Sequence, residues 1–323
     1  MVMNHLQSLV RAIRQKRLTR VIHSPEWADR LLSRGVQPHQ VGFDKKTNSI
    51  LLREFELAVP PNLLFFADAL HLARLLRSAG AHFTVVDGEL HVSMANLDVI
   101  AESAEDFFIL TEVFVRRCYQ FAFSQPVVVW DIGMNVGFAA LFFATQPKVI
   151  AVRSFEPFER TYRQAERNLR LNAAVASKIR TVCRGVGASN QSVEASYSYE
   201  IKGHASTQRN GFGEYPDQPV TKETIQLQAA ADTLETIRAE FPDHPIVAKI
   251  DCEGAEYSII ESLAAANRLR NLAAVMIEWH HRGPEPLLEL LNGCGFFAFA
   301  NSVEKNGTAG MIYATQLPPL TFS

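Results

Sequence analysis

Acidic side chains and glycines recur where buried segments of this sequence end, first in residues 127–137, VVVWDIGMNVG. The apolar start of this stretch predicts a strand that is buried on both faces. Asp131 ends the strand, and Gly133 and Gly137 enclose a turn before the apolar, helix-like run 138–145. Glycines let the main chain approach a ligand closely, and a helix N-terminus offers it free N–H groups. This order of strand, acid, turn and helix predicts a cofactor site for a ligand that carries an amine and hydroxyls.

A second acid, Glu156, follows the next predicted strand, residues 149–155, and precedes the predicted helix 159–171. A carboxylate at a strand end can accept hydrogen bonds from both hydroxyls of a ribose. The alternative for Glu156 is a charge that faces the N-terminal dipole of the helix. The glycine pattern G-x-x-x-G lacks the spacing of dinucleotide-binding turns and also fits a plain connection. Acids at two strand ends favour the cofactor interpretation.

Further acids and a histidine follow two later predicted strands, residues 245–250 and 274–277. Asp251 and Glu253 come directly after the first, where catalytic groups of parallel sheets are expected. His280 comes after the second, and its ordinary pKa suits a general base near neutral pH; the alternative is a hydrogen-bonded histidine at a pocket rim. Asp251 and Glu253 could instead hold a divalent cation that acidifies a hydroxyl. Because only two or three oxygen ligands are visible, the sequence does not predict a metal site.

The elements that position these residues alternate between strands and helices. Residues 127–187 give the pattern βαβαβ, with 179–187 as its third strand, which predicts a parallel sheet covered by helices. Lys249 lies inside a later strand and is expected to be a buried partner of the neighbouring acids. The chain closes with an antiparallel hairpin, for which we expect strands over 296–301 and 311–316 and a turn at Asn306-Gly307. The fold class is therefore α/β.

Residues 1–100 carry no glycine loop of this kind and predict a small N-terminal α+β accessory domain. We expect helical regions over residues 1–35 and 62–78 and a strand over residues 48–57. A hairpin turn is expected at Asp87-Gly88. The first helical region is basic, which fits either a solvated helix face or a patch for a phosphorylated substrate or a partner.

Two further segments connect these parts. A helix over 104–123, N-capped by Ser103, leads into the first strand of the parallel sheet. Residues 189–222 are polar and rich in Gly, Ser and Asn, and they are too long for a simple turn. They predict either a lid over the site or a disordered insert. His204 and Arg209 would contact substrate in the first case and solvent in the second.

Composition limits the classes of protein to which this chain can belong. Its 323 residues are 47% hydrophobic, as in ordinary globular proteins, and its net charge of -2 provides no general field for nucleic acid. Its four cysteines are scattered, which predicts free thiols in a reducing compartment: Cys118, Cys183, Cys252 and Cys294. We see neither a signal peptide nor an apolar run of about 18 residues. We therefore expect a cytoplasmic protein without a membrane partner.

Four motifs in this order make a more specific pattern: a strand followed by D-I-G-x-N-x-G, then F-E-P, then K-I-D-x-E-G-x-E, then I-E. They occupy residues 128–137, 154–157, 249–256 and 276–278. Together with the closing hairpin, they resemble the FkbM family of S-adenosylmethionine-dependent methyltransferases, over roughly residues 104–316.

This resemblance implies a Rossmann-like class I methyltransferase sheet over residues 101–323, mostly parallel with an antiparallel last strand. It also implies S-adenosylmethionine as the cofactor. Asp131, directly or through a water, would hold the amine of its methionine end, and Glu156 would bind the ribose. Asp251 would lie beside the transferred methyl group. The remaining candidate contacts line the turn and, for the adenine, the end of the third strand: Gly133, Asn135 and Gly137, and Gly185, Val186 and Gly187.

The function implied by the resemblance is methylation of a hydroxyl on a small molecule, such as a sugar or a glycosylated or polyketide-type natural product. Asp251, Glu253 and His280 are the candidate catalytic residues, because a hydroxyl acceptor needs a base near its proton. Two alternatives stay open, a nucleic-acid methyltransferase and a non-catalytic cofactor-binding protein. The expected partner is a small-molecule hydroxyl acceptor, not a nucleic acid, and a homo-oligomer is also open.

Overall fold

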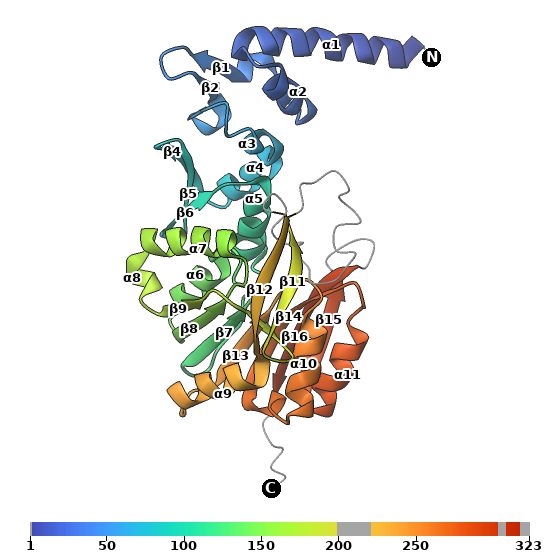
Figure 1. Ribbon diagram of the computed structural model, residues 1–323. Coiled ribbons are helices and arrows are strands. Elements are labelled where there is room, and N and C mark those ends of the chain that lie inside the picture. Colours follow the sequence, from blue (N-terminus) through green and yellow to red (C-terminus); the bar gives the residue numbers. More distant parts are fainter. Residues whose placement is uncertain (1, 199–220, 303–307, 317–323) are drawn as a thin grey trace. The chain divides into compact units, whose positions relative to one another are not determined.

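The computed structural model describes residues 2–198, 221–302 and 308–316. The chain forms two compact units, Met1–Arg116 and Arg117–Ser323, whereas the sequence places the boundary after residue 100 (Figure 1). Most of the polar insert, including His204 and Arg209, lies outside the described residues, as does the expected turn at Asn306-Gly307. Among the described residues, we find no helix that combines the length and the apolarity of a membrane span.

The first unit contains two three-stranded antiparallel sheets, with the orders β1-β2-β3 and β4-β5-β6. Their strands are β1 Val41–Asp44, β2 Ser49–Leu52, β3 Leu57–Val59, β4 His82–Val86, β5 Glu89–Met94 and β6 Leu97–Ala101. The helices are α1 Val2–Ile22, α2 Pro25–Ser33, α3 Phe65–Asp68, α4 Leu70–Ser78 and α5 Ala104–Leu110. The hairpin turn at Asp87-Gly88 is confirmed, with the positive φ angles of 52° and 82° that a type I′ turn requires. Four phenylalanine rings with centroids 5.4 to 5.8 Å apart form a core there: Phe55, Phe66, Phe83 and Phe107.

Three elements of this unit are shorter than the sequence predicts. The strand expected over 48–57 is interrupted by a 3-10 turn, Arg53–Phe55, and by Glu56 at φ 53°. The helix expected over 62–78 is broken into α3 and α4. Ser103 does cap α5, as expected, but the helix expected over 104–123 continues only as a π-helical stretch, Thr111–Arg116, and Arg117 at φ 55° follows it.

The second unit is built on a seven-stranded sheet of the order β15-β16-β14-β13-β7-β8-β9. Its strands are β7 Val127–Ile132, β8 Val149–Phe155, β9 Ile179–Val182, β13 Ile246–Ile250, β14 Leu272–His280, β15 Phe296–Ser302 and β16 Ala309–Gln316. Every strand pair is parallel except those of β16, which runs antiparallel to both of its neighbours. The predicted Rossmann-like sheet with an antiparallel last strand is thus confirmed.

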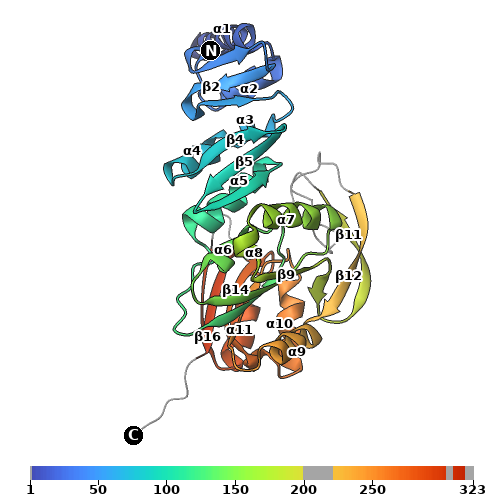
Figure 2. The ribbon, with the colours of Figure 1, turned by 90° about the vertical axis from the view of Figure 1, so that its left-hand side faces the viewer.

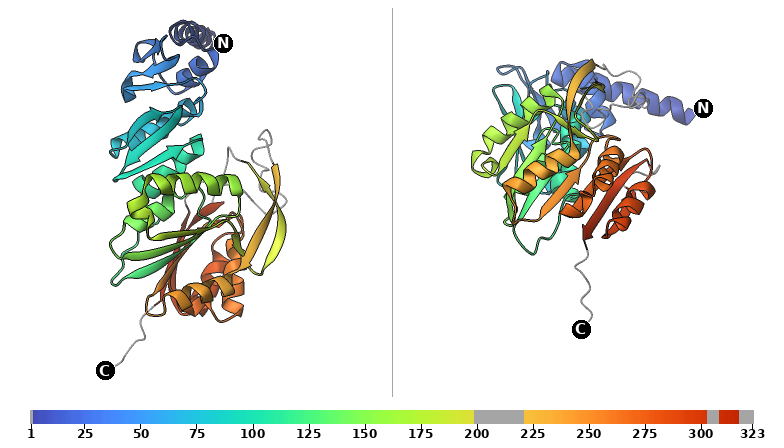
Figure 3. Two further views of the ribbon diagram at one scale, coloured as in Figure 1. Left: turned by 60° about the vertical axis from the view of Figure 1, so that its left-hand side comes forward. Right: turned by 60° about the horizontal axis from the view of Figure 1, so that its bottom comes forward.

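The third strand of the predicted βαβαβ pattern is wrong in its extent. It ends at Val182, and Gly185–Gly187 forms a separate strand, β10, in a second sheet of the order β10-β12-β11. The other strands of this sheet are β11 Gln191–Tyr197 and β12 Thr221–Ala229, which stand apart from the main sheet (Figure 3). The pairing of β10 with β12 is long-range, and single-sequence periodicity does not reveal it.

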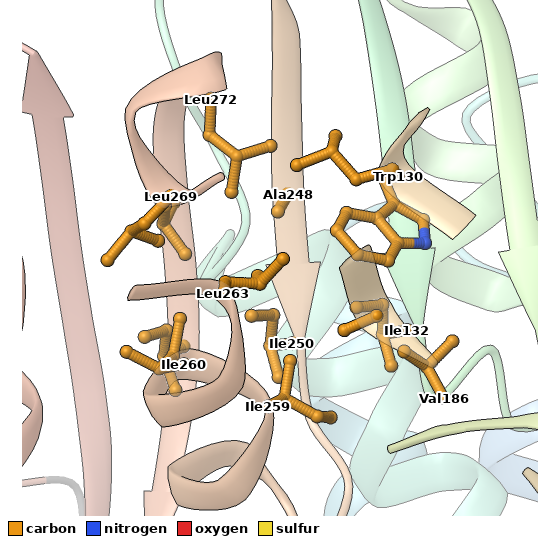
Figure 4. Close-up of a cluster of buried hydrophobic side chains, with 14 of the residues drawn as sticks. Trp130, Ile132, Val186, Ala248, Ile250, Ile259, Ile260, Leu263, Leu269 and Leu272 are labelled. Carbon is orange, nitrogen blue, oxygen red and sulfur yellow. The ribbon is translucent and has the colours of Figure 1, made fainter. Parts of the chain in front are cut away.

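Helices cover both faces of the main sheet (Figure 2). They are α6 Phe138–Thr145, α7 Glu159–Leu171, α8 Ala173–Ala176, α9 Ala230–Glu240, α10 Glu256–Ala265 and α11 Glu285–Gly293. Because successive strand residues point to opposite faces, Trp130 and Ile132 enter a core with Ile259 and Leu263 of α10 (Figure 4). Each such buried aliphatic side chain stabilises the fold by about 1.5–3 kcal/mol. Asp131, between Trp130 and Ile132, points to the opposite face.

Candidate active site

A row of three polar residues crosses the centre of the main sheet. The registers of β8, β7 and β13 place Ser154, Asp131 and Lys249 side by side, so their side chains share one face. Ser154 Oγ donates a hydrogen bond of 2.9 Å to Asp131 Oδ2, and Lys249 Nζ lies 3.4 Å from Asp131 Oδ1. Asp131 has no exposed surface and the Lys249 side chain is 2% exposed. A buried ion pair therefore lies directly beneath the turn that follows β7.

Lys249 is also the link between this row and the acids beyond β13. Its Nζ lies 3.4 Å from Asp251 Oδ2 and donates a hydrogen bond to the main-chain carbonyl of Gly133. Burial lowers the pKa of Lys249, but the charges of Asp251 and Asp131 outweigh burial and leave this pKa above its ordinary value. Burial raises the pKa of Asp131, and Lys249 and Ser154 offset only part of that change. The expectation that Lys249 is a buried partner of the neighbouring acids is confirmed.

The turn after β7 has a conformation that requires its glycines. Gly133, Asn135 and Gly137 have φ angles of 80°, 50° and 87°, all in the left-handed region. A Cβ atom on Gly133 would lie 1.7 Å from the main-chain oxygen of Asp251. On the other side of the turn, Asn168 Nδ2 of α7 donates a hydrogen bond of 2.9 Å to the carbonyl of Val136. Neighbouring elements thus hold the turn on two sides.

Glu156 meets this turn from the end of β8. Its Oε2 accepts a hydrogen bond of 2.9 Å from the main-chain N–H of Asn135, and its Oε1 accepts one of 3.1 Å from the N–H of Phe158. Phe158 caps α7, so Glu156 also has the helix-terminal position that was the alternative for it. Burial raises the pKa of Glu156 to about 7, although both hydrogen bonds act to lower it. Each carboxylate oxygen keeps a second lone pair for a ligand.

Asn135 offers an additional polar atom at the turn. Its side-chain oxygen Oδ1 is buried and has no hydrogen-bond partner among the described residues. Buried polar atoms are nearly always paired in folded proteins, so an unpaired one at a turn of this kind fits a ligand that carries a donor. The amino group of S-adenosylmethionine is such a donor, and the ribose hydroxyls would match Glu156. The residues present at the turn fit this cofactor.

The acids beyond β13 and the end of β14 form one cluster. Ligand atoms of Asp251, Glu253 and His280 all lie within 4.8 Å of one another. His280 Nε2 is 3.7 Å from Glu253 Oε1, and His280 Nδ1 is 3.2 Å from Oε1 of the fully buried Glu256. Burial lowers the pKa of His280, but Glu253, Glu256 and Glu278 outweigh burial and raise this pKa well above its ordinary value. The surroundings of His280 therefore favour a positive charge at its ring.

Tyr119 completes the cluster, and sequence reasoning missed it. Its hydroxyl lies 3.1 Å from Asp251 Oδ2 and 3.3 Å from Glu278 Oε2. A hydroxyl carries one proton, so Tyr119 donates to one of the two carboxylates at a time. Its ring also lies 5.4 Å from Lys249 Nζ. Nothing in the spacing of the chain marks this residue, because its partners are 132 and 159 positions away.

The residues expected to contact adenine form β10, beside the segment that follows β8. Val186 is buried in the core next to Ile132 (Figure 4), and a Cβ atom on Gly185 would lie 2.5 Å from the side chain of Leu227. Gly187 also packs against Leu227. A Cβ atom on Gly185 would also lie 3.3 Å from the side chain of Pro157, the residue after Glu156, so this strand lies beside the proposed ribose contact. The adenine contacts of the three residues stay a prediction. Ser154 was missed as a neighbour of the site, and strand register beside Asp131 is the signal that could have identified it. Glu256 belongs to the acids that the sequence places after β13, and the structure adds its contact with His280.

The chain is similar to one protein family and to several known proteins. Residues 131–297 match the family model described as the methyltransferase FkbM domain. "Methyltransferase 1" of Beauveria bassiana (strain ARSEF 2860) is 24% identical over 174 residues, which cover 50% of this chain and 69% of that protein. Among solved structures, methyltransferase FkbM from Methylobacillus flagellatus KT has 16% identity and a TM-score of 0.41; the match covers 77% of this chain and 59% of that one. M. jannaschii TYW2 in complex with AdoMet has 10% identity and a TM-score of 0.39, with 72% and 91% covered.

Proposed function

Because this chain belongs to the FkbM methyltransferase family, we propose that it transfers the methyl group of S-adenosylmethionine to a hydroxyl of a small molecule. One observation carries the proposal. The main chain of Asp251 packs against Gly133 so closely that no side chain fits between them. The cofactor turn and the cluster of Asp251, Glu253 and His280 therefore share one edge of the sheet, as a donor and its acceptor must.

In this proposal the chain holds the cofactor at the turn. Glu156 accepts hydrogen bonds from the ribose hydroxyls, and Asn135 Oδ1 accepts one from the amino group of the methionine end. Asp131, directly or through a water, binds the same amino group, while Lys249 and Ser154 hold its carboxylate in position. The glycines keep the main chain close to the cofactor.

Methyl transfer is an in-line displacement for which the enzyme mainly supplies alignment. The acceptor oxygen forms a bond to the methyl carbon while the carbon–sulfur bond breaks, and the sulfur keeps that electron pair and becomes a neutral thioether. The hydroxyl proton leaves at the same site, to a base or to solvent. In this proposal Asp251, Glu253 and His280 promote this step. An acceptor rich in hydroxyls, such as a sugar or a glycosylated or polyketide-type product, suits a cluster of this polarity, and we expect it to be methylated in the cytoplasm.

The test is calorimetric titration of the protein with S-adenosylmethionine, with its demethylated product and with NADH. We expect the first two ligands to bind with micromolar dissociation constants and NADH not to bind. Glu156→Gln should weaken binding of both sulfur compounds at least tenfold, and the exposed neighbour Glu159→Gln should leave it unchanged. A Glu156→Gln variant with wild-type affinity would reject the cofactor site described above.

Turnover is then tested with the bound cofactor. Incubation with pools of hydroxylated small molecules should release the demethylated product, whereas RNA should not. Product release with RNA alone would replace the proposed acceptor class with a nucleic acid. Tight cofactor binding without turnover on any pool would favour a non-catalytic binding protein.

A further inference from the structure

The cluster of Asp251, Glu253 and His280 has the dimensions of a metal site. The three ligand atoms lie within 4.8 Å of one another, and the His280 Nε2 to Glu253 Oε1 distance is 3.7 Å. Metal–ligand bonds of about 2.1 Å bring neighbouring ligands of an octahedral ion to about 3 Å. The cluster would therefore close around an ion through small side-chain movements. At 3.7 Å, Nε2 and Oε1 are also too far apart for a hydrogen bond to each other.

The second nitrogen of His280 is held in the way that metal-binding histidines are held. Nδ1 lies 3.2 Å from Glu256 Oε1, which also accepts the main-chain N–H of His280 at 2.8 Å. Glu256 has no exposed surface, and its Oε2 accepts the N–H of Gly254 at 2.7 Å. A carboxylate that accepts Nδ1–H fixes the tautomer, so an ion that displaces the proton favoured at Nε2 would meet a lone pair directed at it. His280 is 7% exposed, so this nitrogen faces the cluster and not bulk water.

The distribution of charge around the cluster also favours a cation. Lys249 contacts Asp131 and Asp251. Its contact with Asp251 is to Oδ2, the same oxygen that the Tyr119 hydroxyl contacts. This leaves Oδ1 of Asp251 as the oxygen for a ligand. The ring of His280 lies close to the carboxylates of Glu253 and Glu256, and Glu278 adds a third negative charge near it. One imidazole with two carboxylates is a donor set that suits divalent first-row transition metals.

We propose that Asp251, Glu253 and His280 bind a divalent transition-metal ion. The geometry of the cluster supports the ion-binding site independently of the proposed function. The use of this site rests on the proposed function: an ion held by these residues would lower the pKa of an acceptor hydroxyl beside it, as metal ions do for water in metal enzymes. The hydroxyl proton would then leave to solvent, and the oxygen would attack the methyl group as the carbon–sulfur bond breaks towards sulfur.

The direct test is titration of the chelator-treated protein with Mn²⁺, with the signal of free Mn²⁺ followed by electron paramagnetic resonance. We expect one ion per chain with a micromolar dissociation constant. Glu253→Gln and His280→Gln should each weaken binding at least tenfold. The matched controls are Glu261→Gln and His281→Gln, because both residues are exposed outside the cluster; they should bind as the wild type does. Circular dichroism confirms that each variant is folded.

Two outcomes would overturn the site: no saturable binding by the wild type, or equal loss of binding in the cluster variants and the controls. Should His280→Gln fail to fold, Glu253→Gln with wild-type affinity for Mn²⁺ rejects the site by itself. Mn²⁺ binding needs neither cofactor nor acceptor, so it separates the two proposals. Ion binding without methyl transfer would reject the proposed function and keep the ion-binding site. Methyl transfer that is unaffected by chelation, in a protein that binds no ion, would keep the proposed function and reject the site.

Discussion

Lys249 donates a hydrogen bond to the main-chain carbonyl of Gly133, so the central strand β13 is tied to the turn that follows β7. The same ammonium group lies 3.4 Å from both Asp131 and Asp251. One buried charge thus holds the position of the proposed cofactor turn relative to the acids of the proposed acceptor site. A change at this lysine should disturb both sites together.

The first prediction concerns that lysine. Lys249→Met leaves two carboxylates without their cation in the core, and loss of one partner from a buried ion pair costs about 3–5 kcal/mol. Urea denaturation should show a loss of this size in the free energy of unfolding. Lys222→Met is the control, because Lys222 and its partner Glu194 are 68% and 63% exposed, and a surface pair contributes about 0–1 kcal/mol. Equal losses in the two variants would contradict a structural role for Lys249.

The second prediction separates backbone strain from steric contact at the turn. Gly133→Ala should suffer both, because Gly133 has φ 80° and its Cβ atom would lie 1.7 Å from the main-chain oxygen of Asp251. Gly295→Ala should suffer strain alone, about 1–2 kcal/mol, because Gly295 has φ 88° and no atom within 4 Å of such a Cβ. We expect calorimetry to show lost affinity for S-adenosylmethionine only in Gly133→Ala. Similar affinities in both variants would mean that the turn does not contact the cofactor.

The third prediction uses the pH dependence of cofactor affinity. The pKa of Glu156 is raised to about 7, and only its ionised form accepts hydrogen bonds from both ribose hydroxyls. Affinity for S-adenosylmethionine should therefore rise between pH 6 and pH 8. Isothermal titrations at each pH should show this rise in the wild type and in Glu159→Gln, and Glu156→Gln should lose it. A rise that persists in Glu156→Gln must come from another group.

Raising the pH has the opposite effect on the stability of the fold: ionisation of Glu156 favours cofactor binding but destabilises the folded chain. Because its pKa in the folded chain lies above the ordinary value of 4.5, the folded state holds the proton more tightly than the unfolded state. The contribution of Glu156 to stability is therefore complete below about pH 4.5 and is lost as the pH rises through about 7. Between these values, the loss of stability on raising the pH should be smaller in Glu156→Gln than in the wild type. Urea denaturation at pH 5 and pH 7 measures the difference.

The fourth prediction concerns Tyr119. Tyr119→Phe removes the hydroxyl that contacts Asp251 and Glu278 but keeps the ring beside Lys249. A hydrogen bond to a charged group contributes about 1.5–3 kcal/mol, so turnover should fall about 10- to 100-fold while cofactor affinity changes little. Tyr162→Phe is the control, because that hydroxyl pairs with Thr181 on the far side of β8. Steady-state kinetics with an identified acceptor would contradict the prediction if both variants kept the wild-type rate.

Local sequence patterns predicted the elements that carry the cofactor turn. The apolar run before Asp131 and the amphipathic run after Glu156 became β7 and α7, because their burial follows from hydrophobic period alone. The pairing of Lys249 with the acids was also predictable, since a lysine inside a buried strand needs an opposite charge.

The elements that local patterns predicted wrongly depend on contacts between residues distant in sequence. Val186 was expected at the end of the third strand, but β10 pairs in parallel with β12, about forty positions later in the chain. The helix expected over 104–123 ends before Arg117, whose left-handed conformation is not marked by a glycine. Tyr119 lies just beyond that point. Its role depends on contacts with residues in the last quarter of the chain, which no window of the sequence contains.

These contacts also bear on how the molecule acquires its activity. The hydrogen bond from Lys249 to Gly133 closes a loop of 116 positions, and that from Tyr119 to Asp251 closes one of 132. Contacts between residues so distant in sequence form slowly, since the entropy of closing the loop is lost before any packing offsets it. A nascent or partly folded chain, even one with helices formed, cannot assemble this cluster until β13 has paired with β7. Ligand binding would therefore indicate that folding is complete. A ligand that binds only the native state also stabilises that state against unfolding.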